Sequence, residues 1–219
     1  MTEAFFFLNP INSLPDYQAE WIPRLSDVNV LGDREFALGN LKPVHDQIIM
    51  EKFPRVRTRH YAEQIHGNSI AVVTGPSESQ AVNHQSVDGL MTNLPGELLA
   101  IYAADCAAIY LVDPVKKAIA LLHSGRKGTE MNILGNAVSQ MCEIYGSSPS
   151  DLICILSPCI RPPDYEVNFA ATIREQANDC GIEQFHDSCE NTASDLHRHY
   201  SYRLEKGKTG RMLALLSIK

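Results

Sequence analysis

The chain has 219 residues, of which 44% are hydrophobic and 21% are charged, and its formal net charge is −7. This composition is typical of a globular protein with a sizeable core and excludes disordered and fibrous classes. The acidic balance also argues against a nucleic-acid-binding surface, because such surfaces carry excess Lys and Arg to neutralise phosphates.

The opening segment MTEAFFFLNP has no cationic start, long apolar region or small-residue cleavage site, so it does not resemble a secretory signal. No stretch is long and apolar enough to span a membrane. The six cysteines form no CxxC pair, which argues against a zinc finger or a thioredoxin-like motif. We expect reduced thiols in a cytoplasmic protein with no membrane partner.

The first predicted elements are a helix and two extended segments. Residues 34–50 place apolar side chains at helical spacing, although Pro43 should kink or divide that helix. Residues 57–74 are extended on both sides of the turn-prone His66-Gly67-Asn68, so we expect His66 at a strand end.

Three apolar runs follow: LLAIYAADC, AAIYLVD and KAIALLHSG. Their residue types fit buried strands, and they predict the centre of a sheet. Cys106 lies between the first two runs and His123 ends the third, so both should lie at strand termini, where open sheets place ligand sites.

The last part of the chain predicts helices alternating with strands. One amphipathic helix should begin at Thr129 as N-cap and end at Gly146, and another should run from Asn168 to Gly181. DLICILS and the final RMLALLSIK fit buried strands. No linker interrupts the chain, so residues 1–219 are expected to form one layered α+β domain, with helices on the faces of a central mixed sheet.

His66, Cys106 and His123 form a candidate zinc set, because zinc accepts nitrogen and sulfur ligands and three of them leave a position open for catalysis. The residues are 40 and 17 positions apart, so no local spacing identifies the site. A buried thiol with two ordinary histidines is the alternative.

The segment HSGRKGT leads from a strand through a Gly-x-x-Gly turn into a helix, which leaves backbone N–H groups free to bind an anion. Ser124, Arg126 and Lys127 could add a hydroxyl and two charges, and an ordinary tight turn is the alternative. Asp105, beside the thiol, is a candidate catalytic base, a partner of a histidine or an exposed carboxylate. The other histidines, including His197 and His199, are expected at the surface.

Six motifs, taken in order, resemble one known family. They are QIHG (64–67), VDGLMT (87–92), ADC (104–106), HSGRKG (123–128), SPCIRPPDYEV (157–167) and SYR with TGR (201–203, 209–211). The chain from about residue 57 onward is similar to the laccase-domain, or multicopper polyphenol oxidase, family, which is now regarded as purine nucleoside phosphorylases with adenosine deaminase activity.

The resemblance implies a central mixed sheet with helices on its faces, and zinc held by His66, Cys106 and His123. It implies phosphorolysis of adenosine, inosine and methylthioadenosine to the free base and ribose 1-phosphate, with possible adenosine deaminase activity. Cys106, His123 and Asp105 would be the catalytic residues. The substrate and phosphate would be bound by Ser124, Arg126, Lys127, Arg203 and Arg211.

The chain departs from the family pattern at several positions. Arg126 stands where the family has a tryptophan, and Ser157 and Arg161 replace the two glycines of a GPCIG motif. The family's early Asn-Arg pair is absent around residues 39–42. The segment after Val167 is shorter than in the family, so one family helix is expected to be missing there, and the helix from Asn168 follows almost at once. Because of these changes, the substrate preference of the family does not transfer directly to this chain.

Three other functions use the same residues. Cys106 as nucleophile and His123 as base would make a thiol hydrolase of amide or ester bonds, with cell-wall precursor peptides as one substrate class. A copper-dependent polyphenol oxidase fits less well, because eight scattered histidines do not supply clustered copper ligands. A non-catalytic, metal-stabilised binding protein is the third. The protein is expected to be a monomer or a homodimer.

Overall fold

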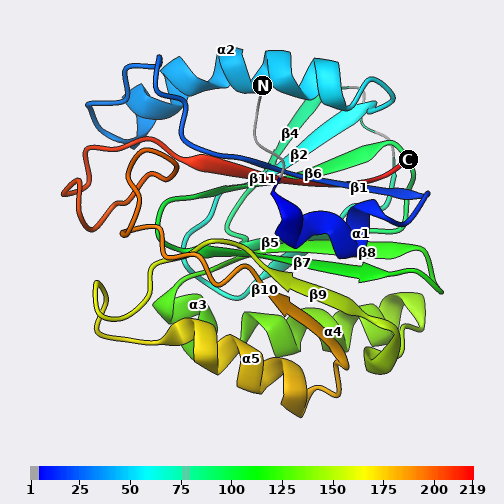
Figure 1. Cartoon of the computed structure of the whole chain (residues 1–219). Coiled ribbons are helices and arrows are strands. Elements are labelled where there is room, and N and C mark those ends of the chain that lie inside the picture. The colour runs from blue at the N-terminus through cyan, green and yellow to red at the C-terminus, as the bar shows by residue number, and fades with distance from the viewer. Residues whose placement is uncertain (1–4, 76, 78) are drawn as a thin grey trace.

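A computed structural model describes residues 5–75, 77 and 79–219, so the first four residues of the opening segment lie outside the described residues. Four layers are visible in Figure 1: helix α2, a first sheet, a second sheet, and a layer with α4 and α5. None of the described helices is long and apolar enough to cross a membrane.

The first sheet has the order β1-β11-β6-β2-β4 and the second has the order β10-β9-β7-β8-β5-β3. The strands of the first are β1 (Tyr17–Ile22), β11 (Met212–Ile218), β6 (Glu97–Ala103), β2 (Thr58–Ala62) and β4 (Ala81–His84). Those of the second are β10 (Gln184–Asp187), β9 (Ile153–Leu156), β7 (Ala107–Asp113), β8 (Ala118–Ser124), β5 (Gly89–Thr92) and β3 (Ile70–Val72).

Both sheets are mixed, since β2 pairs parallel with β6 while β11 pairs antiparallel with β6, and β3 pairs parallel with β5 while β5 pairs antiparallel with β8. The predicted mixed α/β class is therefore confirmed. The strands, however, form two stacked sheets. The runs LLAIYAADC and AAIYLVD, expected in one sheet, are β6 of the first sheet and β7 of the second.

The central strands are apolar along their whole length because each of their faces is covered. In β6, Leu99 and Ile101 pack in the core between the sheets, whereas Leu98 and Ala100 pack in the cluster beneath α2. In β7 and β8 one face shares the core between the sheets and the other packs against α4 and α5. Coverage on both faces explains why these strands do not alternate polar and apolar residues.

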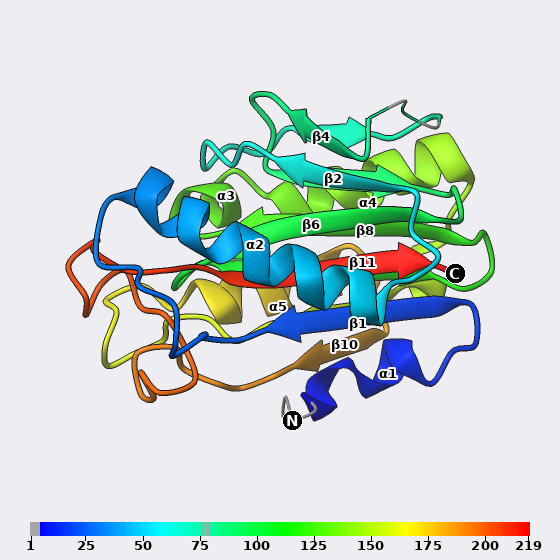
Figure 2. The same cartoon turned by 90° about the horizontal axis from the view of Figure 1, so that it is seen from above.

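The helices are α1 (Asn9–Asn12), α2 (Arg34–Lys52), α3 (Arg126–Glu130), α4 (Ile133–Tyr145) and α5 (Phe169–Asp179), with 3-10 turns at Phe6–Leu8 and Pro149–Asp151. Seen from above, α2 lies across the first sheet (Figure 2). The expected division of this helix at Pro43 is wrong, since α2 runs without interruption. Pro43 is exposed, so its ring and the carbonyl that loses a donor face water.

The start of α4 also differs from the prediction. Thr129 belongs to the short helix α3, and Asn132 is the N-cap of α4, with its side chain accepting from the Gly135 N–H at 3.0 Å. Asn132 has φ 53°, a left-handed conformation that Asn tolerates better than most residues. The predicted C-terminal Gly146 (φ 69°) and the N-cap Asn168 of α5 are confirmed.

Three connections cross from the first sheet to the second; one runs from β4 to β5 through residues 85–88, and the other two carry predicted metal ligands. The chain passes from β2 to β3 through residues 63–69, and from β6 to β7 through Ala104-Asp105-Cys106. Gln64, His66 and Asp105 have φ of 65°, 64° and 77°, so both connections need left-handed residues to turn between layers. Because β2 and β6 are parallel neighbours, the two crossovers lie side by side at one end of the molecule.

Candidate metal centre and cavity

His66, Cys106 and His123 form one cluster although they come from three separate segments. Their ligand atoms all lie within 4.8 Å of one another, and the His66 and His123 rings meet edge to face with centroids 4.9 Å apart. His66 and Cys106 lie on the two crossovers, and His123 lies on β8 opposite Ala108 of β7. Sheet stacking, rather than sequence spacing, brings the three side chains together.

Asp88 holds the His66 backbone and the His123 ring in place. Its carboxylate accepts from the backbone N–H groups of Ile65, His66 and Gly67 at 3.1, 2.9 and 2.6 Å, and it lies 2.8 Å from Nδ1 of His123. The side chain is fully buried. A carboxylate behind a histidine fixes the tautomer and leaves Nε2 for a ligand.

The electrostatics of the cluster favour charged groups despite burial. Burial alone would raise the pKa of Cys106 and lower that of His123, but thiol and imidazole stabilise each other's charged forms. The pKa of Cys106 is therefore lowered and that of His123 is raised, with Asp88 adding to the second effect. Burial opposes ionisation of Asp88 as well, yet the hydrogen bonds from His123, Gly67 and His66 lower its pKa. A thiolate is thus favoured without external base.

Gly125 allows the close approach that the cluster requires. A Cβ atom at this position would lie 2.4 Å from Sγ of Cys106, which is closer than non-bonded atoms can pack. The glycine in HSGRKG therefore has a steric role beside the thiol. It also supplies the N-cap of α3, and the short helix rests on Gly67, whose carbonyl would lie 3.2 Å from a Cβ at Gly128.

The donor set fits a tetrahedral divalent ion with nitrogen and sulfur ligands. Two imidazoles and a favoured thiolate are the ligands of catalytic zinc sites, and ligands of a tetrahedral zinc ion lie roughly 3.5 Å apart. The observed limit of 4.8 Å needs only small side-chain adjustments. His66 is exposed, so a fourth position would face solvent. Among the described residues, this is the single group of three or more metal-ligating side chains with such geometry.

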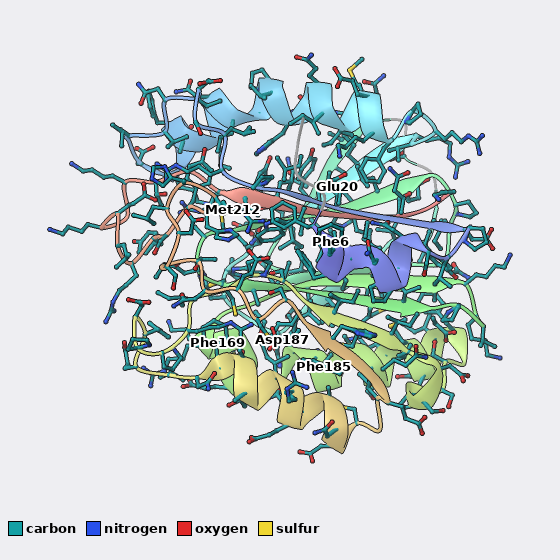
Figure 3. All side chains as sticks on the ribbon, in the orientation of Figure 1. Phe6, Glu20, Phe169, Phe185, Asp187 and Met212 are labelled. Carbon is teal, nitrogen blue, oxygen red and sulfur yellow. The ribbon has the colours of Figure 1, made fainter. Side chains whose placement is uncertain are left out.

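The cluster lies in the wall of a cavity of about 840 Å³, a size that suits a small organic ligand. Tyr102, Tyr165, Phe169 and Tyr202 supply aromatic surface, and six cations line the same cavity: Arg34, Arg126, Lys127, Arg203, Lys206 and Arg211. Residues from the first sheet and from the helical layer below the second sheet line this cavity. Phe169 begins α5 below the second sheet, and Met212, next to Arg211, begins β11 in the first sheet (Figure 3).

Four of the five residues expected to bind substrate line this cavity. Arg126 pairs with Glu130 at 2.8 Å and Arg203 with Glu166 at 3.0 Å, and Lys127 and Arg211 are the other two. Ser124 does not line it. Its hydroxyl is fully buried and lies 2.8 Å from the hydroxyl of Thr129, so it joins the end of β8 to α3 rather than facing a ligand.

Asp105 lines the cavity with its carboxylate already engaged. One oxygen accepts from the Thr192 hydroxyl at 2.7 Å, and the other accepts from the Ser201 hydroxyl at 3.1 Å and the Arg203 N–H at 2.7 Å. The side chain is buried. These contacts support a role that the sequence did not suggest, in which Asp105 holds the loop before β11 against the crossover.

One expectation about the remaining histidines is wrong. His197 is exposed as expected, but His45, His60 and His199 are buried, and Nε2 of His199 lies 3.1 Å from Glu190. Its neighbour Tyr200 is also fully buried, so this segment packs into the molecule instead of forming a solvated loop.

Asp88 and Arg34 are site residues that the sequence did not reveal. Asp88 belongs to the motif VDGLMT, and a buried carboxylate immediately before a strand was an available signal for a partner of a histidine. Arg34 begins α2, 30 residues before the first motif, and nothing in its local sequence connects it to the cavity.

Comparison with known proteins agrees with this fold. The chain belongs to the family described as multi-copper polyphenol oxidoreductase laccase, whose model matches residues 40–171 and 167–219.

Among its relatives is a Bacillus subtilis protein named purine nucleoside phosphorylase YlmD, 29% identical over 195 residues, which cover 73% of this chain and 70% of the relative. Human purine nucleoside phosphorylase LACC1 is 36% identical over 113 residues, 52% of this chain but only 24% of the human protein. The crystal structure of YlmD from Geobacillus stearothermophilus superposes with a TM-score of 0.75 at 25% identity, covering 94% of this chain and 93% of that chain.

Proposed function

We propose that this protein is a zinc-dependent purine nucleoside phosphorylase. The observation that carries the proposal is the position of the His66, Cys106 and His123 cluster in the wall of a cavity that also presents aromatic surface and free cations. The names of the relatives in Bacillus subtilis and human support the same class of reaction.

The chain's own residues can bind both reactants. The aromatic rings of the cavity would hold a purine base by stacking and apolar contact. Lys127, with Arg126, would bind inorganic phosphate at the start of α3, because cations and unpaired backbone N–H groups favour an anion there. Holding phosphate and nucleoside side by side would itself supply much of the rate.

In the reaction, a phosphate oxygen forms a bond to C1′ of the ribose while the bond from C1′ to the purine nitrogen breaks. The electron pair of that bond leaves with the base, which takes up a proton, and ribose 1-phosphate is released. Zinc, when bound by the cluster, would supply a Lewis acid that stabilises developing negative charge. Asp88 would keep His123 in the tautomer that presents Nε2 to the cluster.

Adenosine deamination is a possible second activity with less support. It needs a group that moves protons to and from the purine ring. Asp105 is the one carboxylate among the described residues lining the cavity, and both of its oxygens already accept hydrogen bonds.

The test is to incubate the purified protein with adenosine or inosine, with and without phosphate, and to separate the products by chromatography. Phosphorolysis gives adenine or hypoxanthine only when phosphate is present. Deamination gives inosine from adenosine without phosphate. Formation of none of these products would overturn the proposal.

A metal-free thiol hydrolase is the second candidate, favoured by the order Asp88, His123, Cys106, which resembles a nucleophile activated by an oriented base. It predicts activity on amides or esters that survives chelation, and stoichiometric labelling of Cys106 by a thiol reagent in the active protein. Activity lost to chelator and restored by zinc would exclude it. A copper oxidase would require further clustered ligands, which the described residues do not provide.

A further inference from the structure

The cavity contains more positive charge than a neutral nucleoside and one phosphate require. Arg126 and Arg203 are paired with Glu130 and Glu166, but Arg34, Lys127, Lys206 and Arg211 take part in none of the ion pairs among the described residues. The protein as a whole has a net charge of −7, so the positive charge of this cavity contrasts with the rest of the molecule. It indicates a ligand with more than one anionic group.

The cations come from opposite sides of the cavity. Lys127 belongs to α3, in the layer below the second sheet, whereas Arg34 begins α2, above the first sheet (Figure 1). Arg211 directly precedes β11, in the first sheet. Arg34 and Arg211 are therefore a second group of cations, separate from the phosphate position proposed at α3.

Both guanidinium groups are held in place without being neutralised. Arg34 donates from Nη2 to the carbonyl of Glu63 at 3.0 Å, and Arg211 donates from Nη1 to the carbonyls of Thr209 and Gly210 at 3.0 and 2.8 Å. Arg211 also stacks over the Tyr202 ring at 5.6 Å. Carbonyl contacts fix the orientation of a guanidinium and leave its full charge and its other N–H donors for a ligand.

The two charges oppose each other, and the Glu63 carbonyl is the single side-chain hydrogen-bond partner of Arg34 among the described residues. Burial, followed by the charge of Arg34, lowers the pKa of Arg211. Arg34 is the first residue of α2, where the helix dipole disfavours a cation. It is exposed, so it contributes little packing. The charge of Arg34 at this position interacts unfavourably with the helix dipole and with Arg211 in the free protein. A bound anion would offset both interactions.

We propose that Arg34 and Arg211 form an anion subsite that binds the phosphate group of a phosphorylated nucleoside, so that the cavity accepts nucleoside monophosphates and binds them more tightly than uncharged nucleosides. A phosphate monoester carries about −1.5 to −2 charges at pH 7, which matches two guanidinium groups, and arginine binds its oxygens in a bidentate manner. This inference rests on the proposed function and names its substrate class. Arg34 lies before residue 40, where the match to the family model begins, whereas Arg211 lies within the matched residues 167–219.

The experiment measures binding of three ligands to the full chain by calorimetry: adenosine, adenosine 5′-monophosphate and ribose 5-phosphate. Wild-type protein should bind the monophosphate about tenfold more tightly than adenosine, the difference expected for charge-assisted hydrogen bonds. Arg34→Gln should remove this difference and leave the affinity for adenosine unchanged. Arg55→Gln removes the same charge from an exposed position outside the cavity and should have no effect.

Each outcome separates the subsite from the proposed function. Ribose 5-phosphate binding that is lost in Arg34→Gln, without any binding of adenosine, would support the subsite and contradict the purine assignment. Equal affinity of wild type for adenosine and its monophosphate would overturn the subsite while leaving a nucleoside phosphorylase possible. Equal losses in Arg34→Gln and Arg55→Gln would show only a long-range charge effect and would also overturn it.

Discussion

Cys106 is the residue on which the proposed metal centre depends most. It lies between two imidazoles, and its pKa is lowered because they stabilise the thiolate. We expect wild-type protein to contain about one zinc ion per chain, and Cys106→Ala to lose most of it, because two histidines alone are a weak site. Metal analysis by mass spectrometry checks this. Cys189→Ala, at an exposed free thiol, is the matched control and should keep its zinc. Retention of full zinc in Cys106→Ala would contradict the site.

Lys127 is the residue that tests the proposed phosphate position. It is exposed in the cavity, and no carboxylate among the described residues pairs with it. Lys127→Met should raise the KM for phosphate about tenfold, because a charge-assisted hydrogen bond to an anion is lost. Steady-state kinetics with varied phosphate would measure this, with the exposed Lys116→Met as control. An unchanged KM would place phosphate elsewhere.

At the scale of the element, the start of α4 depends on a single side chain. Asn132 is left-handed and accepts from the Gly135 N–H. Asn132→Ala should lower the free energy of unfolding by about 1–2 kcal/mol, because the helix loses its cap and alanine resists the positive φ. Urea unfolding measures this. Asn132→Gly should cost only a few tenths of a kcal/mol, since glycine is tolerated at the N-cap position and adopts a positive φ without strain. Equal costs for the two variants would contradict the predicted contribution of the left-handed backbone at residue 132.

The packing of α2 on the first sheet should make the protein sensitive to acid. His45 is buried on the inner face of α2, 5.8 Å from the Tyr102 ring, and neither of its nitrogens bonds a described residue. Burial lowers its pKa to about 4, although Asp46 partly opposes the effect. The folded state keeps this ring neutral, while the unfolded chain protonates it below about pH 6.5, so stability falls as pH decreases from 6.5 towards 4.

This linkage predicts that His45 alone lowers the free energy of unfolding by about 2 kcal/mol between pH 7.5 and pH 5. His45→Leu should lack that part of the loss, and comparison with wild type cancels any acid effect on the metal centre. Urea titrations at the two pH values measure the difference. His197→Leu changes an exposed histidine and should behave like wild type. A His45→Leu protein that is as acid-sensitive as wild type would contradict the prediction.

At the scale of the whole molecule, Asp105 joins the crossover between the sheets to the loop that closes the cavity. It accepts from Thr192, Ser201 and the backbone of Arg203. Asp105→Asn keeps the shape and tolerates φ 77°, but it replaces one acceptor oxygen by a donor. We expect a loss of about 1–3 kcal/mol in stability and faster amide hydrogen exchange at residues 201–206. The exposed Asp179→Asn is the control. Unchanged exchange would show that the loop is held by other contacts.

The sequence by itself determined the buried central strands and several helix ends, because these depend on local patterns. The apolar runs around Leu99, Tyr110 and Leu121 predict buried strands, and Gly146 and Asn168 mark helix termini through their own backbone and side-chain chemistry. The ordered motifs also named His66, Cys106 and His123 as one set. The single-domain organisation and the monomer or homodimer expectation remain predictions.

Only the tertiary structure decided which strands share a sheet and what surrounds the cluster. Burial on both faces gives β6 and β7 the same apolar character, so their sequences do not reveal that they belong to different sheets. Asp88 bonds His123, and Arg34 and Arg211 line one cavity, through tertiary packing that no local pattern encodes. The metal-centre residues come from distant segments, and they meet because two neighbouring strands of one sheet both cross to the other at the same end.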